Sequence, residues 1–302
     1  MRRAALNELE VVLAVARQRS FRGAALELGM SATAVSSAVA GVEARIQARL
    51  FHRTTRSVAL TEAGQRYVER ITPALAALRH ADEEAGSLNE APTGILRINA
   101  APETANILFE PLLREYAERY PRMRLDVIAE RRKIDIVAEG FDAGIRLADD
   151  VPQDMIAVPI TGDMRMLVVA SPAYLARHGV PQTPQELAQH QGIYMRFSHG
   201  GRYLWELEKD GAKQEVDIEV RMVLGETRAL RQAACAGLGL AFLAERLIAE
   251  DLEAGRLVPV LPDWCPPFRG LSLYYPGRRH VPEGLRALIE LIHDLRAAKV
   301  PL

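Results

Sequence analysis

The 302-residue sequence predicts a mixed α/β fold, with a small helical unit first and a larger α/β unit after it. Between residues 20 and 46, apolar residues recur at three- and four-residue spacing, which is typical of amphipathic helices. Beyond the turn-rich segment Ala91-Pro92-Thr93-Gly94, short apolar runs alternate with helical patterns, as they do in α/β proteins. A chain of this length can bury two or three separate cores.

Residues 20–46 have the signals of two short helices joined by one tight turn. Ser20 can cap the first helix, Gly29 can adopt the left-handed conformation that ends it, and Ser31 can cap the second. The expected buried face of the second helix is apolar and comprises Val35, Val39, Val42 and Ile46. Short side chains remain on its outer face, namely Ala32, Thr33, Ser36, Ser37 and Ala40. This pattern predicts a helix-turn-helix, whose second helix enters the major groove of DNA.

The next residues, 50–61, predict two short β-segments around a turn that carries Arg53, Thr54 and Arg56. A hairpin in this place is a wing, and its arginines suit phosphates and the minor groove. Two amphipathic helices alone also occur in the cores of enzymes, so the wing strengthens the interpretation as a DNA-binding domain. The candidate DNA-binding residues are Ser31, Ala32, Thr33, Ser36, Ser37, Arg53, Thr54 and Arg56.

A third, long helix is expected from residue 61 to about residue 88. Thr61 can cap it, and Glu62 places a carboxylate in its first turn, where the helix dipole favours negative charge. Its apolar stripe is narrow, which predicts a partner helix rather than a broad packed face. The residues expected at the centre of a dimer interface are Ile71, Leu75 and Leu78. The alternative is that the stripe packs on its own domain.

In the α/β part, strands are predicted at the short apolar runs 95–101, 125–129, 143–147, 166–170, 238–242 and 271–275. Helices are predicted near residues 107–119, 227–236 and 282–298. Sheets of this kind bind ligands at the ends of their strands, so functional residues are expected there.

Composition and charge limit the classes of protein to consider. With 49% hydrophobic residues and no apolar run long enough to cross a bilayer, we expect a globular, cytoplasmic protein without a signal peptide. Cys235 and Cys265 have no Cys or His partners at metal-binding spacing, so we expect reduced, structural thiols. Residues 1–65 contain nine Arg and five acidic residues, whereas the rest contains 29 basic and 34 acidic residues. The excess of positive charge therefore lies at the N-terminal end.

Sequence motifs of catalysis are absent. The chain has no His-Glu-x-x-His, no Gly-x-Ser-x-Gly, no phosphate-binding loop and no Cys-x-x-Cys. Gly237-Leu238-Gly239 precedes a predicted strand rather than a helix, so it is not a dinucleotide fingerprint. We therefore expect no enzyme activity, no cofactor and no metal site.

These motifs together resemble the LysR-type transcriptional regulators, over nearly all of the chain. The N-terminal match comprises Ser20-Phe21, Ala24-Ala25, Leu28, Ser31, Val35-Ser36, Glu43, Leu50-Phe51, Arg53 and Leu60-Thr61-Glu62-Ala63-Gly64. The later match comprises residues 94–98, 120–121, 139–146, 170–175 and 236–239. One departure concerns the recognition helix, where positions often filled by Gln or Arg hold Ala32, Ser37, Ala40 and Gly41, and the usual helix-ending Gly is Gln47. Affinity is then expected to depend on Arg53, Arg56 and the shape of the minor groove.

The resemblance implies three regions and their partners. Residues 1–60 form a winged helix-turn-helix DNA-binding domain, 61–90 a linker and dimerisation helix, and 91–302 an effector-binding domain. That last domain is similar to periplasmic solute-binding proteins, with lobe one at 94–165 and 269–302 and lobe two at 166–268. The implied partners are double-stranded DNA, a small-molecule effector and further copies in a homodimer or homotetramer, with RNA polymerase as an additional partner and no membrane.

The resemblance also places an effector in the cleft between the lobes, with the tight turn at Gly237-Leu238-Gly239 beside it. The corresponding effector-binding residues are Thr104, Glu130, Arg131, Arg146, Arg196 and Thr227. Three arginines beside a helix start favour a carboxylate. Alternatively, Arg146 forms a structural ion pair with Asp142 or Glu226, and Arg196 is solvated.

Two other functions stay open at this point. One is a cytoplasmic small-molecule-binding module that acts through protein contacts rather than DNA, and strong salt dependence of DNA binding would separate it from a regulator. The other is a catalytic α/β protein, against which the missing motifs argue.

Overall fold

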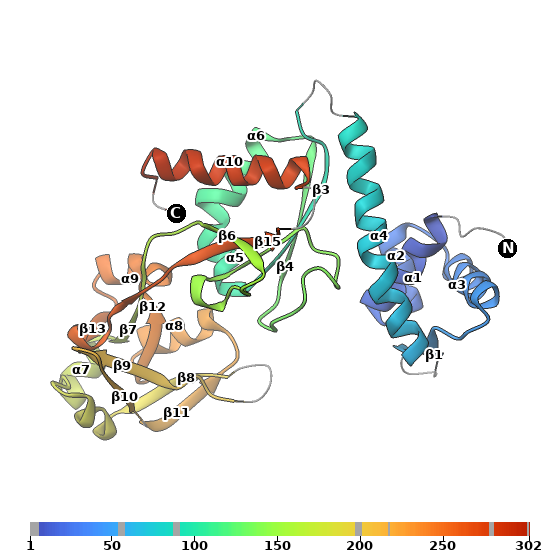
Figure 1. Cartoon of the computed structure of the whole chain (residues 1–302). Helices are drawn as coiled ribbons and strands as arrows, with labels where there is room; N and C mark the ends of the chain where they lie inside the picture. The colour runs from blue at the N-terminus through green and yellow to red at the C-terminus, as the bar shows by residue number, and fades with distance from the viewer. Residues whose placement is uncertain are drawn as a thin grey trace.

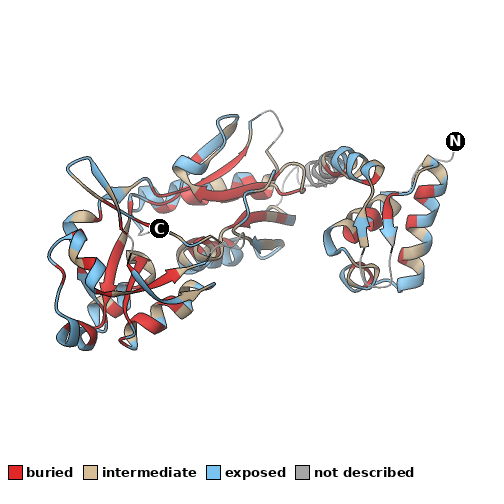
Figure 2. Ribbon diagram, turned by 90° about the horizontal axis from the view of Figure 1, so that it is seen from below, coloured by how far each residue is buried: buried red, intermediate tan, exposed pale blue. Residues whose placement is uncertain are grey.

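The computed structural model describes residues 6–53, 58–86, 91–196, 201–216, 218–277, 281–300 and 302. A helical N-terminal domain, a long helix and two α/β lobes follow one another along the chain (Figure 1). Buried residues gather along the strands of both lobes and on the inward faces of the N-terminal helices (Figure 2). Each of these units therefore has its own core, as the length of the chain predicts.

The N-terminal domain contains α1 (Leu6–Gln18), α2 (Phe21–Leu28), α3 (Ala32–Ile46) and the antiparallel hairpin of β1 (Phe51–Arg53) and β2 (Val58–Leu60). The Ser20 hydroxyl accepts the Gly23 N–H at 3.1 Å, and the Ser31 hydroxyl accepts the Ala34 N–H at 3.1 Å. Gly29 ends α2 with a φ of 63°. These contacts confirm the predicted caps and the left-handed glycine. The chain turns by 107° between α2 and α3, which is typical of a helix-turn-helix.

The wing is fixed to the domain by Glu43, a side chain of α3 that is only 5% exposed. Its Oε1 accepts the N–H of Leu50 at 2.8 Å and that of Phe51 at 3.3 Å. On the other side of the hairpin, Thr61 Oγ1 donates to the Arg49 carbonyl at 2.6 Å and accepts the Gly64 N–H at 2.9 Å. The predicted Thr61 cap is therefore confirmed. The same hydroxyl ties the long helix α4 (Glu62–Gly86) to the start of the wing.

Of the apolar residues predicted for dimerisation in α4, only some are exposed to solvent. Ile71 packs against the N-terminal core, together with Tyr67 and Val68. Leu75 is 6% exposed, whereas Leu78 is 49% exposed. The prediction that Leu75 faces a second copy is therefore wrong for this conformation, because the chain's own residues already cover it. Leu78 keeps an open apolar surface.

Lobe one is built on a sheet with the strand order β4-β3-β5-β15-β6. Its strands are β3 (Gly94–Ala100), β4 (Met123–Ala129), β5 (Ala143–Leu147), β6 (Met155–Pro159) and β15 (Leu271–Pro276). Because β3 runs parallel to β4 and β5, the carboxyl ends of these strands meet at one edge. The helical segments are α5 (Pro102–Leu108), the π-helix η1 (Phe109–Arg114), α6 (Glu115–Arg119), the 3-10 turn η2 (Ala148–Asp150) and α10 (Glu283–Ala297).

Lobe two is built on a sheet with the order β11-β8-β12-β7-β13, and β14 also pairs with β7. These strands are β7 (Met164–Ala170), β8 (Gln191–Met195), β11 (Glu219–Leu224), β12 (Leu240–Ala244), β13 (Val258–Val260) and β14 (Pro267–Phe268). A separate hairpin comprises β9 (Trp205–Lys209) and β10 (Ala212–Val216). The helical segments are α7 (Pro172–His178), η3 (Pro184–Gln189), α8 (Thr227–Cys235), η4 (Glu245–Leu247), α9 (Ala249–Glu253) and η5 (Pro262–Trp264).

The chain passes from one lobe to the other between β6 and β7 and returns between β14 and β15. The two passages touch: Thr161 Oγ1 accepts the Leu271 N–H at 2.8 Å. A Cβ added at Gly270 would lie 2.0 Å from the Gly162 carbonyl oxygen. The passages can therefore approach this closely only because residue 270 has no side chain.

Most predicted elements differ from the structure by one or two residues at their ends, and two of the differences have a clear physical cause. The helix predicted at 107–119 begins already at Pro102, because proline suits the first turn of a helix. Its middle opens into the π-helix η1 around Pro111, which has no N–H for a regular helical hydrogen bond. The strand predicted at 238–242 lies at 240–244, because the turn after α8 extends to Gly239.

Candidate functional site

The outer face of α3 carries the residues that the sequence predicts for DNA contact. Ala32, Thr33 and Ser37 are exposed, and Ser36 is half-buried. Ser31 is also exposed, but its hydroxyl oxygen accepts the Ala34 N–H and so serves as a cap. This face presents hydroxyl and methyl groups, which suit base edges and thymine methyls, and no positive charge that would neutralise phosphates.

Positive charge lies beside α3, at the wing. Arg53 ends β1, but its side chain lies outside the described part of the chain, as do Thr54 and Arg56 altogether. Arg49, absent from the predicted set, lies just before β1 with a side chain that is 78% exposed and an Nη1 3.3 Å from Glu43 Oε2. A basic residue directly before the predicted wing was the signal that could have identified it.

The predicted effector residues lie at the facing edges of the two sheets. Those of lobe one lie at or just beyond the carboxyl ends of the parallel strands β3, β4 and β5: Thr104, Glu130, Arg131 and Arg146. In lobe two, β8 runs parallel to β11 and β12, and the residues after these strands include Arg196 and Thr227. Helix α5 of lobe one lies against the turn η4 of lobe two, which brings the two edges together.

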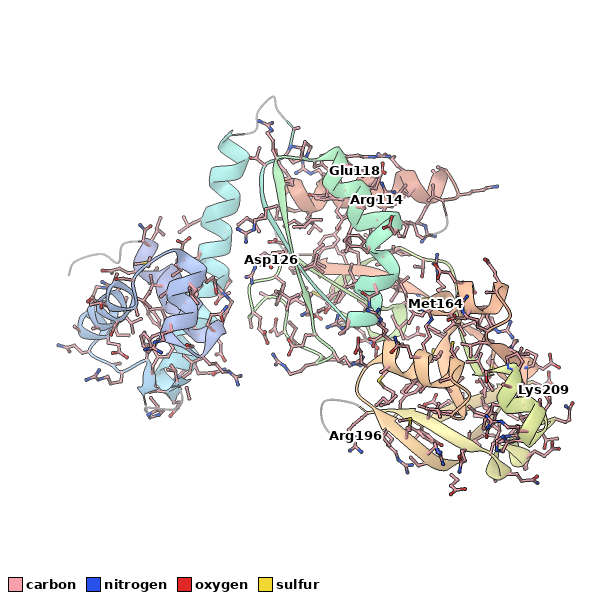
Figure 3. The ribbon with its side chains drawn as sticks, turned by 180° about the vertical axis from the view of Figure 1, so that it is seen from behind. Arg114, Glu118, Asp126, Met164, Arg196 and Lys209 are labelled. Carbon is pink, nitrogen blue, oxygen red and sulfur yellow. The ribbon has the colours of Figure 1, made fainter. Side chains whose placement is uncertain are left out.

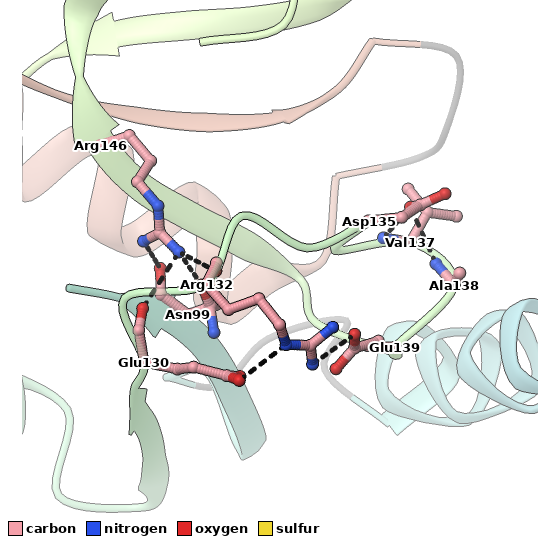
Figure 4. Close-up of polar contacts among 8 residues, drawn as sticks. All are labelled: Asn99, Glu130, Arg132, Asp135, Val137, Ala138, Glu139 and Arg146. Carbon is pink, nitrogen blue, oxygen red and sulfur yellow. Dashed lines mark hydrogen bonds and ion pairs between the residues drawn. The ribbon is translucent and has the colours of Figure 1, made fainter. Parts of the chain in front are cut away.

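Arg146 is a buried cation on β5, only 7% exposed. Its Nη1 donates to the Ile145 carbonyl at 2.8 Å, and its Nη2 donates to the amide oxygen of Asn99 (Figure 4). Longer contacts of 3.4 Å join Nη2 to the carbonyl oxygens of Glu130 and Arg132. All these acceptors are neutral, and burial lowers the pKa of Arg146.

The alternative, an ion pair of Arg146 with Asp142 or Glu226, is not formed among the described residues. Asp142 instead accepts the backbone N–H of Arg97 at 2.8 Å. Next to the guanidinium, Asn99 is fully buried, and in the described part of the structure its Nδ2 has no hydrogen-bond partner. A buried cation and a free amide donor therefore lie side by side at the edge of lobe one.

Two of the other predicted side chains, Arg131 and Thr227, meet at one carboxylate. Glu103, which the prediction left out, lies in the first turn of α5 beside Thr104, itself 6% exposed. Its Oε1 pairs with Arg131 and accepts a hydrogen bond from Thr227 Oγ1 at 2.6 Å. Glu130 faces elsewhere, since its carboxylate pairs with Arg132 at 2.9 Å. An acidic residue in the first turn after a strand was the signal for Glu103.

Lobe two contributes two further arginines. Arg196 is exposed, and its backbone N–H donates to the Leu224 carbonyl at 2.8 Å. Figure 3 places it at the rim of lobe two, near the ends of β8 and β11. Arg246, absent from the predicted set, is half-buried in η4, and burial lowers its pKa. An arginine two residues after the apolar strand β12 was the signal for it.

The turn at Gly237-Leu238-Gly239 does not lie beside this cleft, contrary to the expectation. It follows the C-terminal end of α8, whereas Thr227, at the opposite end of that helix, faces lobe one. The turn instead contacts α7, because Arg177 Nη2 donates to the Gly237 carbonyl at 3.1 Å. Its function is therefore to connect α8 to β12 at the far end of the lobe.

Other features to consider among the described residues are metal sites, membrane-spanning helices and enclosed pockets. They include no group of three or more His, Cys, Asp or Glu that could hold a metal ion, and no single helix among them is long and apolar enough to cross a membrane. A groove of about 510 Å³ lies on the outer side of lobe one, between Phe109 and Leu125, and a hollow of about 320 Å³ lies near Leu257 in lobe two. Neither contains Arg146 or Thr227.

Two family descriptions match the chain. Residues 6–65 match the bacterial regulatory helix-turn-helix protein of the lysR family, and residues 89–297 match the LysR substrate binding domain. The HTH-type transcriptional regulator YcaN of Escherichia coli is 37% identical over 287 residues, which cover 95% of this chain and 94% of that protein.

Solved structures agree with this assignment. The full-length Vibrio cholerae virulence activator AphB, a member of the LTTR family, is 26% identical, with a TM-score of 0.66 over 96% of this chain and 99% of that one. CrgA of Neisseria meningitidis, a LysR-type transcriptional regulator, is 30% identical, with a TM-score of 0.60 over 96% and 98% of the two chains. From its helix-turn-helix to the last helix of lobe one, this chain belongs to the LysR family of DNA-binding transcriptional regulators, and it is not an enzyme.

Proposed function

We propose that this regulator binds a roughly palindromic operator as a homodimer or homotetramer and changes its geometry on DNA when a small anion enters the cleft. It acts in the cytoplasm, on double-stranded DNA. The observation that carries the effector class is Arg146, a buried guanidinium whose hydrogen-bond acceptors are all neutral. A carboxylate effector supplies the hydrogen-bonded counter-ion that Arg146 lacks among the described residues, since the charges of Asp150 and Glu130 act on it only without a hydrogen bond from its guanidinium.

The physical reason is the high free energy of a buried charge without a counter-ion. The free Nδ2 of Asn99 adds a donor beside the guanidinium, and hydrogen bonds to a charged acceptor are about twice as strong as neutral ones. From the other side of the cleft, Thr227, Arg196 and Arg246 add a hydroxyl and two cations. An anion that contacts both lobes binds the closed arrangement preferentially, and only this difference in affinity can shift the regulator between states.

The effector class is tested by measuring thermal unfolding with a panel of carboxylic acids and their amides. The informative variant is Asn99→Asp, which gives Arg146 a permanent carboxylate partner while it keeps the acceptor oxygen. We expect acids, but not amides, to stabilise the wild type, and Asn99→Asp to abolish the effect. Stabilisation by amides only, or an acid response that Asn99→Asp leaves unchanged, would overturn the proposal.

On the DNA side, we propose that α3 reads base edges with short side chains and that arginines of the wing provide most of the affinity. The proposed contacts are Ser31, Ala32, Thr33, Ser36, Ser37, Arg53, Thr54 and Arg56, with Arg49 beside them. The proposed contacts from α3 carry no charge. We therefore expect the arginines of the wing to neutralise the phosphates.

This assignment is tested by titrating the operator beside the regulator's own gene with Arg53→Ala and Arg56→Ala variants over a range of salt concentrations. Each lost phosphate contact is expected to lower the salt slope of log affinity by about one unit. Arg124→Ala in lobe one is the matched control, because Arg124 is also exposed. An unchanged slope in both wing variants excludes the wing contacts. Complete absence of salt-dependent DNA binding favours a module that acts through protein contacts.

A further inference from the structure

A single carboxylate joins the two lobes across the candidate effector cleft. Glu103 belongs to α5 of lobe one, and its Oε1 accepts a hydrogen bond at 2.6 Å from Oγ1 of Thr227, the first residue of α8 in lobe two. The same oxygen pairs with the guanidinium of Arg131, which follows β4 in lobe one. Glu103 therefore connects a cation of its own lobe to a hydroxyl of the other.

The surroundings of Glu103 are those that an anionic ligand needs. Arg131 supplies a guanidinium and Thr227 a hydroxyl donor. The start of α8 adds the positive end of a helix dipole, and the capping residue Glu226 makes no side-chain capping hydrogen bond there. A carboxylate that belongs to the chain thus occupies an anion position between the lobes.

The contact is also accessible to an incoming ligand. The side chain of Glu103 is 26% exposed, and that of Arg131 is 19% exposed. A solute can therefore reach both partners without opening the core of either lobe. A fully buried ion pair, in contrast, would be permanent structure.

We infer that Glu103 is a tethered carboxylate that holds the lobes in their effector-free arrangement and that a carboxylate effector displaces it from Arg131 and Thr227, so that the lobes close on the effector instead. This inference rests on the proposed anionic effector, since it assigns the regulation of the same site. A group held by a short tether acts at an effective concentration on the order of millimolar. A simple acid at lower concentration cannot compete, so the effector must gain further contacts, such as those of Arg146 and Asn99. Glu103 thereby selects against small, common acids.

The inference is tested on the full chain without any effector, by hydrogen exchange of the backbone amides at the start of α8. In Glu103→Ala the lobes lose their connection, and we expect these amides to exchange about tenfold faster. Sodium acetate is then added to about 100 mM, well above the effective concentration of the tether. Acetate can occupy the vacated position and should restore protection in Glu103→Ala, while sodium chloride at the same ionic strength should not.

Controls separate the tether from a general effect on stability. Glu110→Ala removes an exposed carboxylate from η1, the continuation of α5, and should leave exchange unchanged. Glu103→Gln keeps the shape without the charge and provides a second variant if Glu103→Ala folds poorly; we expect intermediate protection. In Glu103→Ala combined with Thr227→Val, acetate should restore nothing, because the hydroxyl of lobe two is missing.

Exchange at the wild-type rate in both Glu103→Ala and Glu103→Gln would overturn the inference. So would acetate that slows exchange by the same factor in the wild type as in Glu103→Ala, because the wild type has no vacated position for it to fill. These readouts need no effector. If the tether is confirmed but no acid stabilises the wild type, the proposed effector class fails and the tether stands. If acids stabilise the wild type through Asn99 and Arg146 while Glu103→Ala exchanges normally, the effector class stands and the tether fails.

Discussion

Among single residues, Asp251 shows most clearly how burial and charge combine in lobe two. It lies in α9, is 1% exposed, and accepts hydrogen bonds from Arg231 of α8 and, at 2.6 Å, from Arg256 Nε. The hydrogen bond from Arg231 lowers the pKa of Asp251; burial acts in the opposite direction, and the hydrogen bond from Arg256 lowers it further. The ionised carboxylate therefore fastens α8 to α9.

This clamp predicts a specific pH dependence. Because the pKa of Asp251 is lower in the folded chain, its contribution to stability is present above the ordinary value of about 3.9 and disappears as the pH falls through the lowered value. We expect Asp251→Asn to unfold at a lower temperature than the wild type at pH 7 and the difference to narrow below about pH 4. Thermal unfolding from pH 3 to 7 measures this. The control Asp263→Asn, at a side chain that is 76% exposed, should follow the wild type throughout, and a constant gap for Asp251→Asn would contradict the clamp.

The candidate effector residues also differ from one another at this scale. The sequence predicts equivalent roles for Arg131, Arg146 and Arg196 as cations at a cleft. The structure separates them: Arg131 has a carboxylate partner, Arg146 has neutral acceptors, and Arg196 is exposed. Thr227 and its partner Glu103 are 124 positions apart, so sequence spacing alone could not assign such contacts.

Among the helices and strands, the end of α3 departs from local preference. Gln47 takes the left-handed conformation, with φ 54° and ψ 35°, and its N–H donates to the Glu43 carbonyl. A residue with a Cβ pays roughly 1–2 kcal/mol for this conformation, whereas glycine does not.

We therefore expect Gln47→Gly to stabilise the N-terminal domain by roughly 0.5–1 kcal/mol, after the entropic cost of glycine is subtracted. Gly29 has the same conformation at the end of α2, with φ 63°, so Gly29→Ala should destabilise by about 1 kcal/mol. Chemical denaturation of both variants provides the comparison. If Gln47→Gly is less stable than the wild type, contacts of the glutamine side chain outweigh the backbone strain.

The long helix α4 carries a separate prediction about assembly. Leu78 exposes 49% of its surface, so it is the residue of the predicted stripe that a second copy can cover. Leu78→Glu should yield a monomer with weaker operator binding, because a charge buried against apolar side chains costs several kcal/mol. Light scattering measures the mass. Glu69→Lys, which changes the charge on the opposite face of α4, should leave the oligomer intact, and an unchanged mass for Leu78→Glu would remove this interface.

At the scale of the whole molecule, the N-terminal part contacts lobe one directly. Thr72 of α4 is 7% exposed, and its Cγ2 would lie 2.9 Å from a Cβ added at Gly140, in the segment between β4 and β5. Burial raises the pKa of Glu27 in α2, but hydrogen bonds from Arg17 and Gln18 and the charges of Arg17 and Arg97 outweigh it and lower the pKa. Arg97 belongs to β3 and donates to the Gly140 carbonyl at 3.0 Å and to Asp126, which Figure 3 labels on the side of lobe one turned toward α4.

The segment between β4 and β5 thus connects the cleft to the linker helix. At its start, the carbonyls of Glu130 and Arg132 accept hydrogen bonds from Arg146 (Figure 4). Near its end, Gly140 lies against Thr72 of α4. Arg132 spans the segment through pairs with Glu130 at 2.9 Å and Glu139 at 3.1 Å. A change at Arg146 can therefore reach α4 through a short, continuous set of contacts.

Gly140→Ala tests the contact between the lobe and the helix. Gly140 has a φ of 73°, so alanine is strained there, and its Cβ also collides with Thr72. We expect lower stability and a changed operator affinity. Thr72→Ser removes the methyl group that collides and should restore part of the loss in the Gly140→Ala background while it is near neutral alone. A double-mutant cycle by thermal unfolding and DNA titration measures the coupling, expected at roughly 0.5–3 kcal/mol, and strict additivity would exclude the contact.

The sequence by itself determined the features that depend on neighbouring residues. The caps Ser20, Ser31 and Thr61, the left-handed Gly29 and the apolar faces of α2 and α3 follow from local hydrogen bonding and helical periodicity. The central strands β3, β5 and β15 follow from apolar runs. The hairpin of β9 and β10 had a readable signal as well, since buried Trp205 and Leu207 alternate with Glu206 and Glu208, but one open face made it less apolar than the central strands.

Only the tertiary structure decided which charges neutralise one another and which apolar residues remain open. Glu43 anchors the wing, Glu103 joins the lobes and Leu75 is covered within the chain, and the local sequence pattern assigned none of these contacts. The physical reason is that the energy of a charge or an apolar surface depends on what surrounds it in space. Those surroundings are assembled from strands and helices far apart in the chain, so they exist only once the lobes and the linker helix have packed together.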